Sequence, residues 1–322
     1  MSTLTEPAVA RALLDTATTR LDGKRNAAST VSRNRAILYN AFEYAVEMKV
    51  LPKNPLKDLK WKAPRAAREV DRRSVVNPEQ ADALLKAVGK QKPSGPRLVA
   101  FFGVMYYSAL RPEEAVRLAE HNVSLPAQLW DETSESWVEP DYDDDWGELH
   151  IGSAGPDIGS RWTDSGKQRE DRGLKHRPEG ATRTVPVPPE LTKLLRAHLA
   201  EHGTGPGRRL FWGVRGDDLP TCTYHRAWDK ARMAALIPDE YDSPLAKRPY
   251  DLRHACVSTW LNGGVDPTQV AEWAGHSVAV LFKIYAKCLV GQYEAAKRRI
   301  AAALRPGRSW ERIGNSQPEK AG

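Results

Sequence analysis

The chain has 322 residues, which exceeds the size at which one hydrophobic core usually keeps growing, so two domains are expected. Hydrophobic residues make up 41% of the chain and charged residues 28%, ordinary globular values that exclude global disorder and collagen-like repetition. The longest apolar stretch, residues 98–110, is too short to span a bilayer, so the composition also argues against a membrane protein.

The amino terminus and the cysteines indicate a cytoplasmic protein of a prokaryotic cell. The first fifteen residues lack the basic-then-apolar layout of a secretory signal. Cys222, Cys256 and Cys288 have no spacing typical of a disulfide framework or a metal site. We therefore expect reduced, buried thiols.

The net charge of +7 is unevenly distributed along the chain. Residues 1–74 hold fifteen Lys and Arg against eight Asp and Glu, residues 124–150 hold nine acidic residues and no Lys or Arg, and residues 151–322 are again basic. Two basic regions on either side of an acidic insert fit a protein that binds a phosphate backbone through both basic regions. Two solvated basic surfaces without a ligand are the alternative, and charge alone does not separate these interpretations.

Residues 1–56 predict a small helical domain. Ser29 and Thr30 are placed to cap a helix whose apolar positions repeat at helical spacing as far as Met48. Residues 57–74 are basic and poor in apolar side chains, which predicts a linker that could follow a phosphate backbone. The candidate binding residues of this region are Arg33, Arg35, Lys57, Lys60 and Lys62.

A larger domain is predicted over residues 75–305. Asn77 as N-cap, Pro78 and Gln80 form a strong helix-start signal, and the apolar helix of residues 98–110 follows. A second start is predicted at Asp266, and Gly263, Gly264 and Gly275 are predicted helix stops. The last helix is expected over residues 292–304, and residues 306–322 form a tail.

Strand-like runs interrupt the helical pattern of this domain. Residues 124–173, which are acidic and rich in Asp, Gly and Trp, contain two of them, at residues 148–151 and 161–163. Residues 182–187 form a third run, which closes at a Pro-Pro pair before an amphipathic helix over residues 190–202. The sequence therefore predicts a mainly α fold with a small antiparallel β-sheet.

Arg111 follows the apolar helix at the point where that helix should leave the core. A guanidinium held there has a planar fork that suits a phosphate group. Glu114 lies three residues further on, so it can share a helical face with Arg111 and orient it. Taken alone, such a pair is more often a surface ion pair.

Three further pieces of sequence contain residues that carry chemistry. Arg253 lies in the first turn of a predicted helix, within Y-D-L-R-H. His276 stands between Gly275, which ends one helix, and Ser277, which can cap the next, so it is expected at a backbone corner. Tyr285 follows nine residues after His276.

In order and spacing, these four pieces resemble the sequence boxes of the tyrosine recombinases, the family that includes the phage integrases. The family's boxes are G-L-R-x-x-E, H-x-L-R-H, L-G-H and a tyrosine nine residues after the last histidine. This chain has A-L-R-P-E-E, Y-D-L-R-H, A-G-H and Tyr285. The resemblance covers about residues 26–305.

The resemblance implies a catalytic role for each matching residue. Arg111 and Arg253 would clamp a phosphate of DNA, and His276 would donate a further hydrogen bond to it. Tyr285 would attack phosphorus and form a 3′-phosphotyrosyl bond, in a reaction that needs neither a metal ion nor a cofactor. The chemistry is consistent with these roles, because metal-free phosphodiester cleavage needs cationic groups around the charge that develops on the oxygens.

The resemblance also implies a lysine that protonates the leaving 5′ oxygen, in a β-hairpin ahead of an R-x-V-P-L strand. Lys175 fits this place before Arg183-Thr-Val-Pro-Val187. The gap between Lys175 and Arg183 is longer than the common form, so Lys167 and Arg177 stay open as alternatives. A solvated lysine without a role in catalysis is a further alternative.

Two features depart from the family pattern. Tyr250 stands where the second box usually has His or Lys, and a phenol donates a hydrogen bond without adding charge, so weaker phosphate stabilisation and slower chemistry are expected. Two helices precede the linker where the family commonly has about four. The region of residues 1–56 is therefore interpreted as a partial core-binding domain.

The leading hypothesis is a site-specific recombinase or integrase that acts on double-stranded DNA in the cytoplasm, associated with the nucleoid. The resemblance implies a homo-tetramer on two duplexes, with exchange of the last helix between neighbours and an accessory DNA-bending or directionality protein. A truncated remnant that only binds DNA is one alternative, favoured by the short amino-terminal helical region and by Tyr250. A type IB topoisomerase-like activity that relaxes supercoils is another.

Overall fold

The structure, a computed structural model, divides into two compact units, Met1–Arg68 and Glu69–Gly322. The predicted tail and most of the predicted last helix lie outside the residues that the structure describes. The described residues are 4, 6–62, 64, 69–138, 140, 145–175, 177–288, 297–298, 300–301 and 304.

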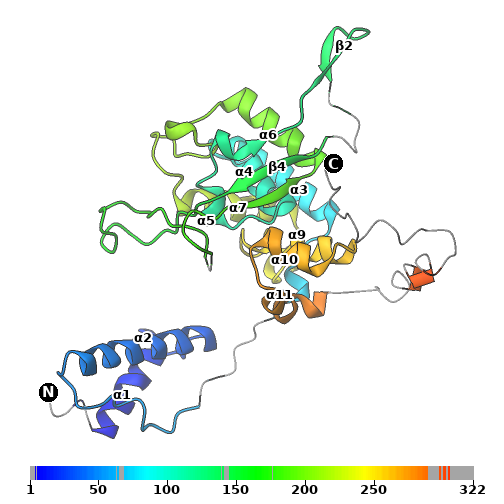
Figure 1. Cartoon of the computed structure of the whole chain (residues 1–322). Coiled ribbons are helices and arrows are strands. Elements are labelled where there is room, and N and C mark those ends of the chain that lie inside the picture. The colour runs from blue at the N-terminus through cyan, green and yellow to red at the C-terminus, as the bar shows by residue number, and fades with distance from the viewer. Residues whose placement is uncertain are drawn as a thin grey trace, which may run out of the picture. The chain divides into compact units, whose positions relative to one another are not determined.

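The first unit is built on two helices, drawn in blue in Figure 1: α1 (Pro7–Thr18) and α2 (Ala28–Glu47). Ala10 and Leu14 on α1 and Val31 on α2 are buried. Beyond α2 the chain turns back, and the Asn54 side chain donates to the Tyr39 carbonyl on α2 (3.1 Å). This unit therefore has a small core of its own.

The start of α2 differs from the predicted start. The helix begins at Ala28 and has no side-chain cap hydrogen bond, so the prediction that Ser29 or Thr30 caps it is wrong. The amide of Asn26 donates to the Thr18 carbonyl (3.0 Å), which fixes the chain immediately before the helix.

The second unit is mainly helical. Its short 3₁₀ turns are η2 (Arg72–Ser74), η3 (Glu120–Asn122), η4 (Pro206–Arg208) and η5 (Ala286–Cys288). Its α-helices are α3 (Pro78–Gly89), α4 (Gly95–Tyr107), α5 (Pro112–Ala115), α6 (Pro189–His202), α7 (Thr221–Ala235), α8 (Pro238–Asp242), α9 (Asp251–Asn262), α10 (Pro267–Ala274) and α11 (Val278–Tyr285).

Two of these helices begin at the predicted caps. Asn77 accepts a hydrogen bond from the Gln80 amide (2.8 Å), and the Gln80 side chain accepts one from the Asn77 amide (3.2 Å). Asp266 accepts from the Thr268 amide (2.8 Å) at the start of α10. Both predicted starts are confirmed, because the capping interaction is local and can be inferred from neighbouring residues.

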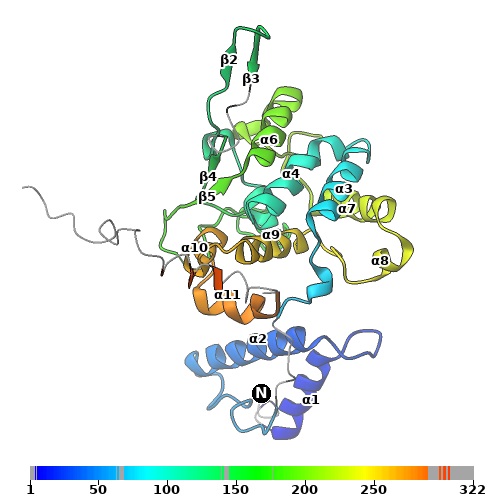
Figure 2. The same ribbon diagram turned by 90° about the vertical axis from the view of Figure 1, so that its right-hand side faces the viewer.

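The β-structure of this unit is small and antiparallel. The strands are β1 (Val123–Ser124), β2 (Leu129–Asp131), β3 (Ser136–Val138), β4 (Gly147–Ile151) and β5 (Arg183–Val187). β1, β4 and β5 form a three-stranded sheet in the order β1-β4-β5, and β2 pairs with β3 in a hairpin that extends away from the rest of the unit (Figures 1 and 2). The predicted mainly α fold with a small antiparallel sheet is confirmed.

Residues 161–163 are not a strand, contrary to the prediction. They form turns and bends, and the Trp162 side chain is exposed. The segment between β4 and β5 makes only isolated bridges among the described residues, Ala154 with Arg172 and Asp157 with Arg169. These bridges lie outside residues 161–163, which therefore have no neighbouring strand to pair with.

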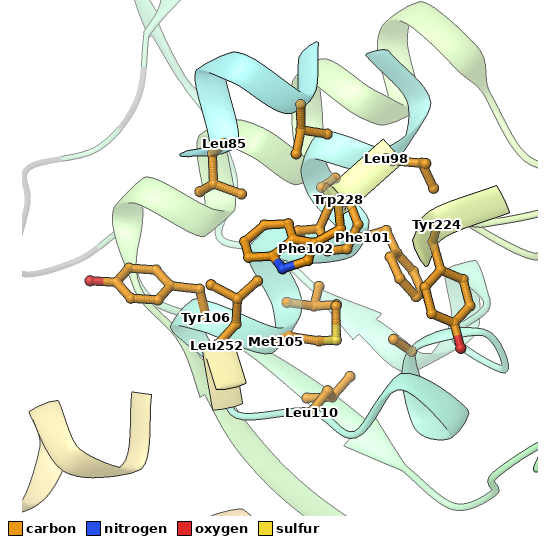
Figure 3. Packing of buried hydrophobic residues seen from close by; sticks show 14 of the residues in the cluster. Leu85, Leu98, Phe101, Phe102, Met105, Tyr106, Leu110, Tyr224, Trp228 and Leu252 are labelled. Carbon is orange, nitrogen blue, oxygen red and sulfur yellow. The ribbon is translucent and has the colours of Figure 1, made fainter. Parts of the chain in front are cut away.

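Aromatic side chains fill the core of the second unit (Figure 3). Phe101 and Phe102 on α4 pack against Tyr224 and Trp228 on α7, with ring centroids 5.0 and 4.8 Å apart. The buried Trp228 donates its indole N–H to the Ala246 carbonyl (2.8 Å). The buried helix predicted over residues 98–110 is α4, but it begins three residues earlier, at Gly95, and ends at Tyr107, before the left-handed turn at Ala109.

All three cysteines are free thiols, but only Cys256 and Cys288 are buried. Cys222 is exposed, so the expectation of three buried thiols is wrong. Cys222 is the second residue of α7 and lies on the side of that helix that faces away from the core. Within the part of the chain that the structure describes, every helix is too short or too polar to cross a membrane.

Candidate active site

Arg111 lies where α4 gives way to α5. Between the two helices Ala109 has a φ of 51°, a left-handed conformation that is uncommon for alanine and stores strain. The Arg111 guanidinium donates from Nη1 to Glu114 Oε1 (2.8 Å) and from Nη2 to the Gly275 carbonyl (2.9 Å). Glu114 also accepts from the Arg111 amide (2.8 Å). Contacts on both sides therefore hold Arg111 in one orientation.

Glu114 joins two guanidinium groups. Its side chain is buried and accepts from Arg183 Nη1 and Nη2 at 2.8 and 2.7 Å, in addition to Arg111. Although burial alone would raise the pKa of Glu114, the hydrogen bonds and charge of Arg183, with the charge of Arg111, hold it well below its usual range. The Glu114 carboxylate is therefore ionised and fixes both arginines.

Arg253, in the first turn of α9, is fully buried. It donates from Nη1 to the Ala109 carbonyl and from Nη2 to the Ala274 carbonyl, and Nη2 lies 2.9 Å from His276 Nε2. Burial, and then the charge of Arg111, lowers the pKa of Arg253 from its usual value. The Arg253 guanidinium thus connects the α4–α5 junction with the segment after α10.

His276 occupies a corner between two helices. Gly275 ends α10 with a φ of 62°, and Ser277 caps α11 by accepting from the Val280 amide (3.3 Å), as the sequence predicted. Burial, followed by the charges of Arg253 and Arg111, lowers the pKa of His276 to about 3, so its imidazole is neutral at neutral pH. Within the described residues, His276 Nδ1 is buried and has no hydrogen-bond partner.

Tyr285 ends α11 and is only 1% exposed. Its hydroxyl lies 2.9 Å from Nδ1 of His254, and its ring centroid is 6.2 Å from that of His276. Burial raises the pKa of the Tyr285 phenol, against the opposing effect of the Arg253 charge. The structure therefore brings Arg111, Arg253, His276 and Tyr285 together, with the phenol protonated and enclosed.

A cleft of about 710 Å³ lies over this cluster. Lys175 and Tyr250 line it, together with Arg111 and His276, whereas Arg253 and Tyr285 do not. Lys175 is exposed and lies in a turn of the irregular segment between β4 and β5, not in the expected hairpin, because that segment makes only isolated bridges in its described part. The remaining lining residues are Glu113, Arg177, Gly275, Ser277 and Val280.

The basic residues predicted to bind DNA in the first unit lie on or after α2. Arg33, Lys57, Lys60 and Lys62 are exposed. Lys57 is paired with Glu43, at a distance of 3.0 Å between the charged groups. Arg35 is partly buried, with its guanidinium 5.2 Å from the ring centroid of Trp61.

Two residues of the cluster were not predicted from the sequence. Arg183 begins β5, and its position after a long loop gave no sign that it pairs with Glu114. His254 directly follows Arg253, but its contact with Tyr285 depends on how α9 and α11 pack. In the described part of the chain, no three His, Cys, Asp or Glu side chains are grouped so that they could hold a metal ion.

The sequence matches no protein-family model, and no curated protein is similar to it in sequence. Solved structures are similar in fold. The Tn1549 transposon integrase, in complex with a circular intermediate DNA, has a TM-score of 0.63 at 14% identity, over 93% of this chain and 85% of that one. XerH site-specific recombinase, bound to its difH substrate in a pre-cleavage complex, has a TM-score of 0.55 at 13% identity, over 93% and 71%. The chain therefore has the fold of the tyrosine recombinases.

Proposed function

We propose that the chain cleaves and rejoins DNA strands as a site-specific recombinase or integrase, through a covalent 3′-phosphotyrosyl bond to Tyr285. The observation that carries this proposal is the convergence of Arg111, Arg253 and His276, from three separate elements, beside one tyrosine. The fold shared with an integrase and a recombinase that bind DNA supports the same class of substrate.

The arrangement suits a phosphate that gains negative charge during the reaction. Arg111 and Arg253 supply two fixed positive charges, and guanidinium groups donate to phosphate oxygens in pairs. Arg253 Nε and His276 Nδ1 are buried polar atoms without a partner in the described part of the chain. Such atoms are costly unless a ligand satisfies them, which supports a site that is completed by a phosphate.

Attack by the Tyr285 oxygen on phosphorus would release the 5′ oxygen of the next nucleotide. Lys175, at the rim of the cleft, is the proposed donor of the proton that this oxygen needs. Tyr250 would donate a hydrogen bond to the same phosphate. A 5′-hydroxyl can then attack the phosphotyrosyl bond and reseal the strand without ATP, because that bond retains the energy of the original phosphodiester.

The burial of Arg253 and Tyr285 means that the site must open before a phosphate reaches them. The carbonyl of Ala274 and the imidazole of His276 both contact the Arg253 guanidinium. We therefore propose that the corner around Gly275 shifts when DNA binds, while α9 and the end of α11 keep their places.

Double-stranded DNA is the proposed partner, and the first unit is proposed as a second DNA-binding part. Its exposed Arg33, Lys57, Lys60 and Lys62 would contact phosphates, which gives affinity without sequence specificity. Recombination between two duplexes requires four strand cleavages, so four copies of the chain are proposed to act together.

A nicked suicide duplex tests the proposal, because the short downstream fragment that carries the free 5′-hydroxyl diffuses away after cleavage, so the strand cannot be resealed and the covalent intermediate accumulates. The wild-type chain should form a protease-sensitive DNA adduct on a duplex that carries its site. Tyr285→Phe should form none, whereas Tyr241→Phe, which removes a partly buried phenol on α8 that donates to Asp229 (3.2 Å), should match the wild type. An adduct that persists in Tyr285→Phe would overturn the proposal.

The burial of Tyr285 also favours a second candidate function, DNA binding without cleavage. In that case the wild-type chain would retard duplex DNA on a gel but form no adduct with any candidate site. Supercoil relaxation by the wild-type chain, without recombination, would instead indicate a topoisomerase-like activity.

A further inference from the structure

The contact between His254 and Tyr285 joins two separate helices. His254 lies in the first turn of α9, directly after Arg253, and Tyr285 is the last residue of α11. The distance from His254 Nδ1 to the Tyr285 hydroxyl is 2.9 Å, and the ring centroids are 5.6 Å apart. In the described part of the chain, this is the one side-chain hydrogen bond of the Tyr285 hydroxyl.

Burial determines the direction of this hydrogen bond. Burial, and then the charges of Arg253 and Arg248, lowers the pKa of His254 to about 4, so the imidazole is neutral at neutral pH. The raised pKa of Tyr285 keeps the phenol protonated. The phenol therefore donates, and Nδ1 of the neutral imidazole accepts.

The geometry points to His254 as the base that takes the proton from Tyr285 during strand cleavage, an inference that rests on the proposed function. The phenol oxygen forms a bond to phosphorus while its proton passes to Nδ1, and the bond from phosphorus to the 5′ oxygen breaks. In resealing, the imidazolium returns the proton to the phenol oxygen. No further reactant is needed, because the proton is exchanged within the pair.

The other groups near the phenol are less suited to this role. His276 is the second imidazole, but its Nε2 is engaged by Arg253 and its ring lies 6.2 Å from that of Tyr285. Tyr250, whose ring is 5.1 Å from that of His254, is itself a phenol. Arg253 carries no lone pair to accept a proton.

The bound phosphate would strengthen His254 as a base. The charges that oppose its protonation are those of Arg253 and Arg248, and the neutral groups that face it are Tyr250, Tyr285 and His276. A phosphodiester on Arg253 adds a negative charge close to this cluster, and that charge grows in the transition state. Proton transfer to His254 is thus favoured only when DNA occupies the site.

Three variants test the inference by the single-turnover rate of adduct formation on the suicide duplex. His254→Asn keeps a hydrogen-bond acceptor near the position of Nδ1 but removes the base, and His254→Ala removes both. Each of the two His254 variants should form the adduct about 100-fold more slowly than the wild type, which is the usual loss of rate when a general base is removed. His121→Asn, which changes an exposed histidine on η3, should keep the wild-type rate.

A second substrate has sulfur in place of the bridging 5′ oxygen. Because a thiolate leaves without a proton, this substrate needs no acid at Lys175 but still needs a base for the Tyr285 phenol. This substrate should restore the rate of Lys175→Ala but not that of the His254 variants. A His254→Asn rate equal to the wild type, or its rescue by sulfur, would overturn the inference, whatever the behaviour of His254→Ala. No adduct from the wild-type chain would overturn the proposed function itself, and the inference with it.

Discussion

Glu114 shows how one buried carboxylate can organise a cationic site. Two arginines, Arg111 and Arg183, share it at distances of 2.7–2.8 Å, and its side chain is 2% exposed. A buried ion pair adds little net stability, because desolvation offsets the attraction, but removing one partner leaves an uncompensated charge. The main effect of Glu114 is therefore to hold two positive charges in place beside a third, that of Arg253.

Glu114→Gln should lower the free energy of unfolding by about 3 kcal/mol, the usual cost of leaving a buried charge unpaired. Glu120→Gln is the matched control, because Glu120 pairs with Arg208 at the surface, where the loss should stay below about 1 kcal/mol. Urea unfolding of both variants measures the difference. Equal losses in the two variants would show that Glu114 does not hold the arginines as described.

Tyr250 is the residue whose replacement should improve the chemistry. When a phosphate is bound, its negative charge favours the protonated form of an imidazole at this position. The imidazolium would then add a charge-assisted hydrogen bond to the phosphate, worth roughly 1.4 kcal/mol more than that of a phenol, or about tenfold in rate. Tyr250→His should therefore speed adduct formation on the suicide duplex. Abolished activity in a folded Tyr250→His variant would contradict this electrostatic account.

The corner between α10 and α11 positions two residues of the site at once. Gly275 presents its carbonyl to Arg111, and the next residue is His276. A Cβ on Gly275 would lie 3.3 Å from nitrogen atoms of both Arg111 and Arg183, and its φ of 62° disfavours any side chain. The corner therefore combines a backbone requirement with a close approach to the arginines.

Gly275→Ala should lower stability by about 1 kcal/mol through backbone strain and should also slow adduct formation at least tenfold, because Arg111 and His276 are displaced. Gly166→Ala separates the two effects, since Gly166 has a φ of 67° and no atom within 4 Å of an added Cβ. This control should lose similar stability and keep its activity. Thermal unfolding measures the loss of stability in both variants, and the adduct rate measures the displacement of Arg111 and His276. Equal adduct rates in the two variants would contradict the prediction.

Local sequence patterns predicted the elements whose interactions are local. The caps at Asn77 and Asp266 and the corner at Gly275 depend on neighbouring residues, and the structure has them where the sequence placed them. The strand expected at residues 161–163 is absent, because a strand needs a partner that its own sequence does not specify. The contacts of Arg183 and His254 were missed for the same reason, since each depends on a distant element.

The four residues that converge lie between positions 111 and 285, and no periodicity in the sequence relates them. Their grouping was expected only from the resemblance to a family, and the structure brings the side chains together. The burial of Tyr285 and Arg253 was not foreseen. It arises from the packing of α9 against α10 and α11, which is a property of the whole second unit.

This burial makes the stability of the chain depend on pH. His254 and His276 have folded pKa values of about 4 and 3, below the ordinary value of 6.5. At a pH between each folded pKa and 6.5, the unfolded chain therefore binds more protons than the folded chain. Stability should therefore fall as the pH decreases from about 6.5 towards 4. At pH 5 each histidine should cost roughly 1–2 kcal/mol relative to pH 7.

Urea unfolding at pH 7 and pH 5 measures this loss, and His254→Asn should show a smaller loss than the wild-type chain. The same loss in His254→Asn as in the wild type would show that His254 is not buried in its neutral form.

The attachment point of DNA is the most direct test of the central claim. After the suicide reaction, nuclease trimming and proteolysis, mass spectrometry of the peptides identifies the residue that carries the nucleotide. We predict a 3′-linked nucleotide on Tyr285 and on no other residue. A nucleotide on a different side chain, or DNA that binds tightly and is never joined to the protein, would contradict the account.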